Sequence, residues 1–162
     1  MVKITKESYI PSHPSLFIVD FSSRSLRAQK HFEIGETICF LEAHSKGSDT
    51  YTTFQCGPKD RIELRSDLAY VAHSCEPNIA FDLSSHDRSK WHVRAVQDIE
   101  LGSPLTFFYP STEWNLAKPF DCRCGARTCL GRVEGAKSLH REALMRRPHV
   151  NPWILFDEQA CL

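Results

Sequence analysis

The stretch YVAHSCEPNIAFD, residues 70–82, sets a His, a Cys, a Pro and an Asn within six positions between two apolar flanks. Pro77 and the polar Glu76 predict that Cys75 lies in a loop, since proline cannot donate a hydrogen bond within a sheet. Three roles fit a cysteine at this place: core packing, a nucleophile beside His73, or a ligand whose partners lie further along the chain. The choice depends on where the other cysteines lie.

A second stretch, FDCRCGARTCLG (residues 120–131), carries three thiols within eight residues. Gly125 allows a tight turn between them, and this spacing is typical of a metal knuckle. Structural zinc takes four ligands in a tetrahedron, so one ligand is missing here. Cys75 is the strongest candidate, because a loop can reach another segment. Free or disulfide-linked cysteines, and a Cys75–His73 nucleophilic pair, remain alternatives. The seven cysteines are Cys39, Cys56, Cys75, Cys122, Cys124, Cys129 and Cys161.

The composition is that of an ordinary globular domain. The 162 residues are 41% hydrophobic and 25% charged, with a net charge of zero. We therefore expect no general attraction to nucleic acid or to anionic lipid. No apolar run approaches the roughly 20 residues of a membrane span, and no secretory signal is visible at the N-terminus. These features predict an intracellular protein, in the cytoplasm or the nucleus, where disulfides are rare.

Short apolar runs separated by turn residues predict a mainly β fold. Near the C-terminus, residues 134–147 carry apolar side chains at helical spacing and predict an amphipathic helix that ends before Pro148. The apolar segment 150–156 is expected to dock on the rest of the chain. The predicted strands are 15–21, 37–42, 79–83, 91–96 and 104–109.

One segment echoes another. LRAQKHFEIGETI (26–38) aligns without gaps on VRAVQDIELGSPL (93–105), at an offset of 67 positions. Gly35 then matches Gly102, and each unit is expected to be a strand, a turn with glycine at positive φ, and a second strand. The alternative is two similar turns without further relation. A repeat of two units does not predict a solenoid, which needs about three.

These motifs, in this order, resemble the SET-domain family of lysine methyltransferases with its post-SET cysteine cluster: AHSCEPN (72–78), IELGSPLTFFY (99–109) and FDCRCGARTCLG (120–131). The segment 26–38 resembles the family's N-terminal strand pair. The resemblance implies a β-clip-like fold of small curled sheets with a pseudoknot at the active site. It also implies a SET domain (1–117), a zinc knuckle (118–133), and a C-terminal helix with an apolar tail (134–162).

The resemblance also implies roles for individual residues. Cys75 would complete a structural zinc site, and Tyr109 would line the channel where the lysine amine meets the methyl donor. Phe107 stands where the family sets how many methyl groups are added, and Phe there favours higher methylation. The implied zinc ligands are Cys75, Cys122, Cys124 and Cys129; the implied S-adenosylmethionine contacts are Arg24, Ser25, Ala72, His73, Tyr109 and Leu130; the implied substrate channel is Phe81, Phe107, Phe108 and Trp114. Methyl transfer needs in-line alignment in a narrow channel, and aromatic rings accommodate a methylated cation.

The sequence departs from the family pattern at the donor site. Ser23-Arg24-Ser25 replaces a Gly-x-Gly turn, Ala72 replaces an Asn, and Phe108 replaces an Asp. The segment 43–66, which usually helps to read a peptide, is short. Three functions therefore stay open: a lysine methyltransferase; a SET fold that binds or converts a small apolar metabolite without methyl transfer, for example as a cyclase; and a non-catalytic interaction module. The substrate is accordingly a protein lysine or a small molecule.

Overall fold

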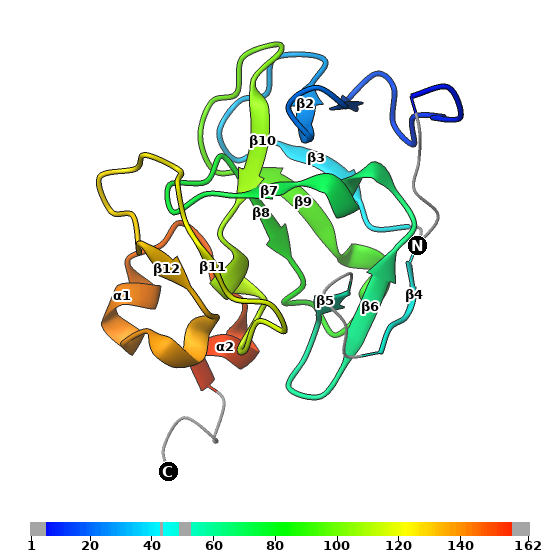
Figure 1. Cartoon of the computed structure of the whole chain (residues 1–162). Coiled ribbons are helices and arrows are strands. Elements are labelled where there is room, and N and C mark those ends of the chain that lie inside the picture. Colours follow the sequence, from blue (N-terminus) through cyan, green and yellow to red (C-terminus); the bar gives the residue numbers. More distant parts are fainter. Residues whose placement is uncertain (1–5, 43, 49–52, 157–162) are drawn as a thin grey trace.

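The computed structural model describes residues 6–42, 44–48 and 53–156, and it is built from four small sheets (Figure 1). The first has the order β1 (Phe17–Asp20), β2 (Ser25–Ala28), β10 (Pro104–Phe107), β7 (Ala72–His73). The second has the order β3 (Thr37–Phe40), β9 (His92–Ala95), β8 (Ile79–Asp82). The third has the order β4 (His44–Lys46), β6 (Arg61–Leu64), β5 (Phe54–Gln55), and the last pairs β11 (Phe120–Asp121) with β12 (Arg132–Val133).

The helical segments are all short. The 3-10 turns are η1 (Asp67–Tyr70), η2 (Arg88–Lys90), η3 (Tyr109–Ser111) and η4 (Ala136–Ser138), and the α-helices are α1 (Arg141–Met145) and α2 (Pro152–Phe156). This confirms the predicted mainly β fold of small sheets, and each predicted strand is found within two residues of its predicted bounds. Within the described part of the chain, no helix is long and apolar enough to cross a membrane.

The two echoed segments meet across a local twofold axis. Phe32 and Ile99, at matching positions of the two units, exchange both backbone hydrogen bonds at 2.9 Å. The N–H groups of Gly35 and Gly102 each donate, at 2.9 Å, to the alanine carbonyl that ends the first strand of the other unit. Both glycines have positive φ, +87° and +82°. The prediction of two comparable strand–turn–strand units is confirmed, and their pairing builds the centre of the fold.

The single helix predicted over 134–147 is wrong. Two short segments, η4 and α1, replace it, with Leu139 and His140 extended between them. Gly135 starts the segment at φ +115°, and the Ser138 hydroxyl donates to the Gly135 carbonyl at 3.0 Å, which favours a local turn over a continuing helix. The apolar positions still share a face, because Ala136 and Leu144 are both buried in one cluster.

The C-terminal segment packs against the sheets through a buried amide. Asn151 is fully buried, and its Oδ1 accepts a hydrogen bond from the N–H of Leu83 at 2.9 Å. Its Nδ2 donates to the carbonyls of Phe81 and Ser111 at 2.9 and 3.1 Å. These bonds join the chain before α2 to β8 and η3, beside an apolar cluster that includes Ile154. The tail residues 157–162, including Cys161, lie outside the described residues.

Candidate functional site

Two segments far apart in the sequence run parallel and make the centre of the site. β7 pairs with β10, so that His73 lies beside Phe107. The loop after β7 continues the contact: Asn78 Oδ1 accepts from the N–H of Thr106 at 2.8 Å, and Asn78 Nδ2 donates to the carbonyl of Pro104 at 2.9 Å. AHSCEPN is thereby fixed alongside PLTFFY, as the SET resemblance predicts.

Phe107, on β10, belongs to a row of packed aromatic rings. Phe107 lies 4.7 Å from Phe81, 5.4 Å from Phe54 and 4.7 Å from Tyr109, measured between ring centroids. Phe81 and Phe107 are buried, while Phe54 and Tyr109 are partly exposed. Such spacings are typical of packed aromatic pairs. The row therefore forms an aromatic wall that ends at a hydroxyl.

The hydroxyl of Tyr109 is held in place by the backbone. It donates to the carbonyl of Val71 at 3.0 Å, just before β7. Burial, and then the negative charge of Glu113, raises the pKa of Tyr109 to about 12. The phenol therefore stays neutral at physiological pH and is a hydrogen-bonding group, not a general base.

The other predicted channel residues lie elsewhere. Phe108, the residue after Phe107, is buried in the C-terminal cluster with Leu144 and Ile154, because successive extended residues face opposite sides. Trp114 packs at the edge of that same cluster. Of the four predicted channel residues, the structure thus brings together Phe81 and Phe107, with Tyr109.

Two aromatic residues at the site were missed from the sequence. Phe54 lies on β5, within a segment that predicted no strand. Phe120 lies within the knuckle, two residues before Cys122, and its ring lies 5.9 Å from that of Tyr109 and 5.6 Å from that of His73. The sequence signal for Phe120 is an apolar residue two positions before the first cysteine of the knuckle. This signal predicts burial, but not which residues Phe120 contacts.

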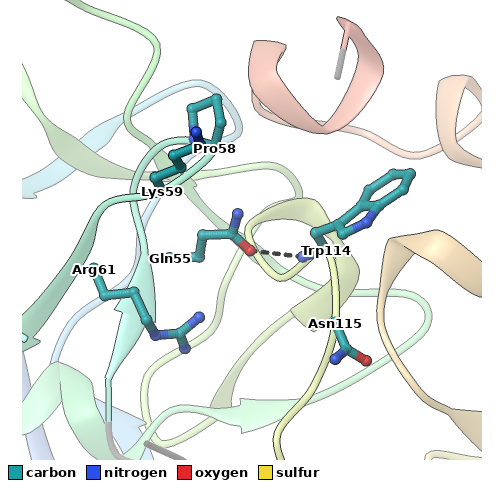
Figure 2. A pocket seen from close by; sticks show the side chains of 6 residues that line it. All are labelled: Gln55, Pro58, Lys59, Arg61, Trp114 and Asn115. Carbon is teal, nitrogen blue, oxygen red and sulfur yellow. Dashed lines mark hydrogen bonds between the residues drawn. The ribbon is translucent and has the colours of Figure 1, made fainter. Parts of the chain in front are cut away.

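A pocket of about 240 Å³ lies between Gln55 of β5 and the segment Trp114–Asn115 that follows η3 (Figure 2). Figure 2 shows Gln55 between Lys59 and Arg61 on one side and Trp114 and Asn115 on the other. The amide oxygen of Gln55 accepts from the N–H of Trp114 at 2.8 Å, which joins β5 to the segment after Tyr109. The pocket is therefore built from the two chain segments that also carry the ends of the aromatic row.

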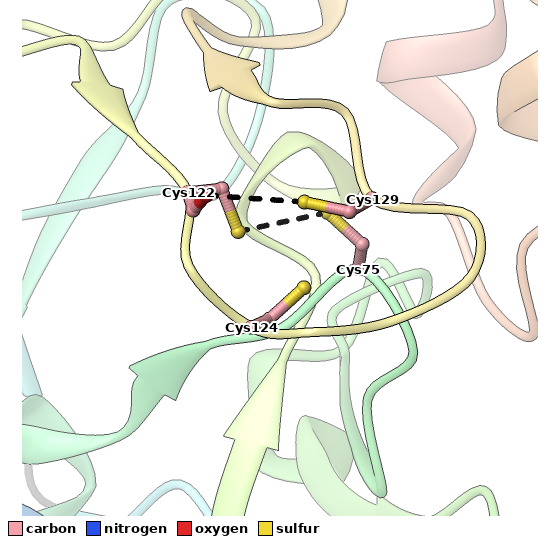
Figure 3. A group of neighbouring side chains, drawn as sticks. All are labelled: Cys75, Cys122, Cys124 and Cys129. Atoms are coloured by element: carbon pink, nitrogen blue, oxygen red, sulfur yellow. Dashed lines mark hydrogen bonds between the residues drawn. The ribbon is translucent and has the colours of Figure 1, made fainter.

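The four predicted zinc ligands converge (Figure 3). The Sγ atoms of Cys75, Cys122, Cys124 and Cys129 all lie within 4.8 Å of one another. Zinc–sulfur bonds of about 2.3 Å in a tetrahedron place sulfurs about 3.8 Å apart, so small side-chain shifts complete the geometry. None of these cysteines, nor Cys39 or Cys56, forms a disulfide in the described residues.

Backbone donors point at these sulfurs, as a thiolate site requires. The N–H of Leu130 lies 3.3 Å from Cys75 Sγ, and that of Gly131 lies 3.4 Å from Cys129 Sγ. Burial opposes ionisation of Cys124, but hydrogen bonds from backbone N–H groups and neighbouring thiols outweigh it and lower its pKa to about 6. The donor set therefore fits Zn²⁺, which would supply a rigid tie between the loop of Cys75 and the knuckle.

His73 connects the knuckle to the aromatic row. Its Nδ1 accepts from the N–H of Tyr109 at 3.2 Å, so the ring proton sits on Nε2, 3.3 Å from Cys75 Sγ. Burial, aided by the charge of Arg147, lowers the pKa of His73 to about 4, and the imidazole is neutral. Cys75 is only 1% exposed, and its sulfur lies within 4.8 Å of three other cysteine sulfurs. Both observations argue against Cys75 as a nucleophile.

The predicted donor-site residues come from neighbouring strands. Ser25 begins β2, Ala72 and His73 form β7, and β10 lies between these two strands. Arg24 takes φ +53°, the left-handed conformation that a side chain rarely adopts, so the turn keeps a glycine-like shape without glycine. Arg24 is exposed, and its side chain projects from the turn that opens this sheet.

Comparisons with known proteins agree with this geometry. Methyltransferase flvH of Aspergillus flavus is 45% identical over 106 residues, which are 62% of this chain and 57% of flvH. Histone-lysine N-methyltransferase mes-4 of Caenorhabditis elegans is 35% identical over 79 residues, 42% of this chain and 8% of mes-4. The chain thus spans just over half of flvH and a small part of mes-4.

Solved structures share the fold. KRYPTONITE in complex with mCHG DNA and SAH has a TM-score of 0.52 and 22% identity, covering 67% of this chain and 26% of that chain. KRYPTONITE with mCHH DNA, H3(1-15) peptide and SAH has a TM-score of 0.50 and 26% identity, over the same shares. A family model described as SET domain matches residues 23–110, just over half of the sequence. The chain belongs to the SET-domain family.

Proposed function

We propose that this protein transfers a methyl group from S-adenosylmethionine to the side-chain amine of lysine, free or within a protein. The observation that carries the proposal is the aromatic row that ends at the Tyr109 hydroxyl, beside the strand of Ala72 and His73. The lysine ammonium first loses a proton to water; the nitrogen lone pair then attacks the methyl carbon, and the carbon–sulfur bond breaks with its electron pair going to sulfur, which leaves a methylated ammonium. S-adenosylhomocysteine is the second product.

In this proposal, each part of the site has a separate task. Phe54, Phe81 and Phe107 would hold the aliphatic stem of lysine, and Tyr109 would orient the amine. Phe120 would close the row on the side of His73. Aromatic faces stabilise the methylated cation that forms, and they exclude water that would solvate the amine.

The donor would bind where β2, β10 and β7 adjoin. Arg24, Ser25, Ala72 and His73 would contact it from the sheet, and Leu130 from the knuckle, whose N–H is already bound to Cys75 Sγ. The knuckle, once zinc is bound, would fix this wall. Relatives support the choice: flvH is named a methyltransferase and mes-4 a histone-lysine methyltransferase, and one KRYPTONITE structure holds SAH with a histone peptide.

Family membership gives no support to a non-methylating enzyme or an interaction module. The absence of nucleic-acid and membrane contacts stays a prediction from the zero net charge. An intracellular setting would keep the four thiols reduced and available to zinc.

The test begins with the donor. Titration calorimetry should detect S-adenosylmethionine binding to the zinc-loaded protein, and a labelled-methyl assay should then detect transfer to lysine or to a lysine peptide. Mass spectrometry of the product counts the methyl groups, and Phe107→Tyr should lower that number because the added hydroxyl narrows the channel. No binding at millimolar donor would overturn the proposal.

A further inference from the structure

The pocket between Gln55 and Trp114 shares its framework with the aromatic row but has a different chemistry. Gln55 directly follows Phe54, whose ring stacks on that of Phe107. Trp114 directly follows Glu113, whose N–H bonds to the carbonyl of Tyr109 at 3.0 Å. Glu113 links the two sites, because its carboxylate accepts from the Arg61 guanidinium of the pocket and its charge raises the pKa of Tyr109 in the row.

The acidic group nearest the pocket is already engaged. Glu113 is buried, and its two carboxylate oxygens accept from the N–H of Gln55 and from the guanidinium of Arg61, both at 2.8 Å. The Gln55 side-chain oxygen is likewise used by the N–H of Trp114. The carboxylate of Glu113 and the amide oxygen of Gln55 thus already accept hydrogen bonds from the protein itself.

Other polar groups that line the pocket are hydrogen-bond donors. The six residues that line the pocket include two cations, Lys59 and Arg61, and no carboxylate. Arg61 is paired with Glu113, whereas Lys59 is exposed and has no ion-pair partner in the part of the chain that the structure describes. The Asn115 amide is exposed beside the Trp114 ring. One ammonium without an ion-pair partner, beside the Asn115 amide and the Trp114 ring, suits a carboxylate.

We propose that this pocket binds a carboxylate of the methyl acceptor, with Lys59 as its ionic partner. The favoured substrate class is then an amine that also carries a carboxylate, either free lysine or a peptide lysine flanked by an acidic residue. The proposal rests on the proposed methyl transfer. The kinetic test below requires that reaction, whereas the binding test below does not.

The kinetic test compares L-lysine with L-lysinamide, which differ in the carboxylate. Lysine should have a KM about tenfold lower than lysinamide, and Lys59→Gln should remove that difference by raising the KM for lysine. Lys46→Gln is the matched control, because Lys46 is an exposed lysine on β4, at the opposite edge of the same sheet. An equal KM for lysine and lysinamide in the wild type excludes free lysine as the source of the carboxylate, and an equal KM in the peptide pair as well would overturn the proposal.

A peptide pair identifies the source of the carboxylate. Acetyl-Lys-Asp-amide and acetyl-Lys-Asn-amide differ only in the acidic group, so a Lys59-dependent preference for the first assigns the pocket to a peptide side chain. The same preference seen with free lysine alone assigns it to the amino acid. No preference in either pair contradicts a carboxylate site.

A binding test separates this inference from the proposed reaction. Lysine should change tryptophan fluorescence more strongly than lysinamide, and Trp114→Phe should abolish the difference, because Trp114 is the tryptophan that lines the pocket. If lysine binds through Lys59 but no methyl group is transferred, the pocket assignment holds and the proposed reaction fails. If methyl transfer occurs and fluorescence shows no carboxylate preference, the pocket assignment fails and the reaction stands.

Discussion

The guanidinium of Arg147 donates to the backbone carbonyl of Cys75 at 2.7 Å, and so joins the chain after α1 to the loop that carries the fourth cysteine. The same group donates to the hydroxyl of Thr128 in the knuckle at 3.0 Å and lies over the ring of Phe108, 4.7 Å from its centroid. One side chain therefore contacts the loop, the knuckle and the residue before Tyr109.

Arg147→Ala should weaken metal retention. Each hydrogen bond from a charged donor contributes about 1.5–3 kcal/mol, so the knuckle loses much of its attachment to the loop. Zinc release to a chelating dye should be at least several-fold faster than in the wild type. Arg146→Ala is the control, because the exposed side chain of Arg146 makes no hydrogen bond or ion pair among the described residues. Equal release rates in the two variants would contradict this role.

Cys124→Ser should release the metal altogether. Three remaining thiols cannot complete the tetrahedron, and a structural zinc site contributes directly to folding free energy. Metal analysis should find one zinc per wild-type chain and less than half of that in the variant, with a lower Tm. Cys39→Ser should retain zinc, because Cys39 lies on β3, outside the cluster. A wild-type protein purified without zinc would contradict the four-cysteine assignment.

Tyr109→Phe should reduce turnover strongly while the fold persists. The variant loses the hydroxyl that bonds to the Val71 carbonyl, at a cost of about 1 kcal/mol in stability. Misplacement of the amine should lower kcat about a hundredfold. Circular dichroism and zinc content should match the wild type. Unchanged turnover would remove Tyr109 from the mechanism.

The pH dependence should follow the substrate amine. The pKa of Tyr109 is raised to about 12, so this group does not titrate between pH 7 and 9. At saturating donor, the rate should rise with pH in that range because a larger fraction of lysine is unprotonated. A plateau near neutral pH, absent from Tyr109→Phe, would show instead that Tyr109 acts as a base.

The raised pKa of Tyr109 also predicts how the stability of the folded protein changes at high pH. The pKa of Tyr109 in the folded protein lies above its ordinary value of 10.0, so folding favours the neutral phenol. Its contribution to stability is complete below pH 10 and is lost as the pH rises to about 12. Unfolding in urea at pH 9 and pH 11 should show a larger loss of stability in the wild type than in Tyr109→Phe.

Asn151→Ala should loosen the C-terminal segment. It leaves the N–H of Leu83 and the carbonyls of Phe81 and Ser111 buried without these partners, at a cost of about 2–3 kcal/mol. Urea unfolding measures the change. Asn115→Ala, at an exposed asparagine, should leave stability within about 0.5 kcal/mol of the wild type.

The sequence predicted the parts of the site that depend on spacing along the chain. Cys122, Cys124 and Cys129 are close in sequence, so their convergence follows from local geometry, and the matched Gly35 and Gly102 predicted their own turns. The structure confirms both patterns. Spacing therefore carries most of the information that identified the fold.

The direction in which each side chain faces was harder to predict from the sequence. Phe107 and Phe108 are both apolar and adjacent, and only the pairing of β10 decides that one faces the aromatic row and the other the C-terminal cluster. Phe54 reaches the row because β5 pairs with β6, and no periodicity in its short segment signals that pairing. Contacts between distant short strands depend on tertiary packing, which a single sequence does not encode locally.

The twofold pairing around Phe32 and Ile99 has a consequence for how such a chain can arise. Each strand–turn–strand unit satisfies its backbone hydrogen bonds by pairing with the other, as two identical short peptides would in a symmetric dimer. The centre of the protein therefore has the form of a homodimer fused into one chain. In the second unit β10 ends at Phe107 and leads to Tyr109, whereas in the first β3 ends at Phe40 and leads to Leu41. Duplication of such a unit leaves one copy free to change while the other maintains the scaffold.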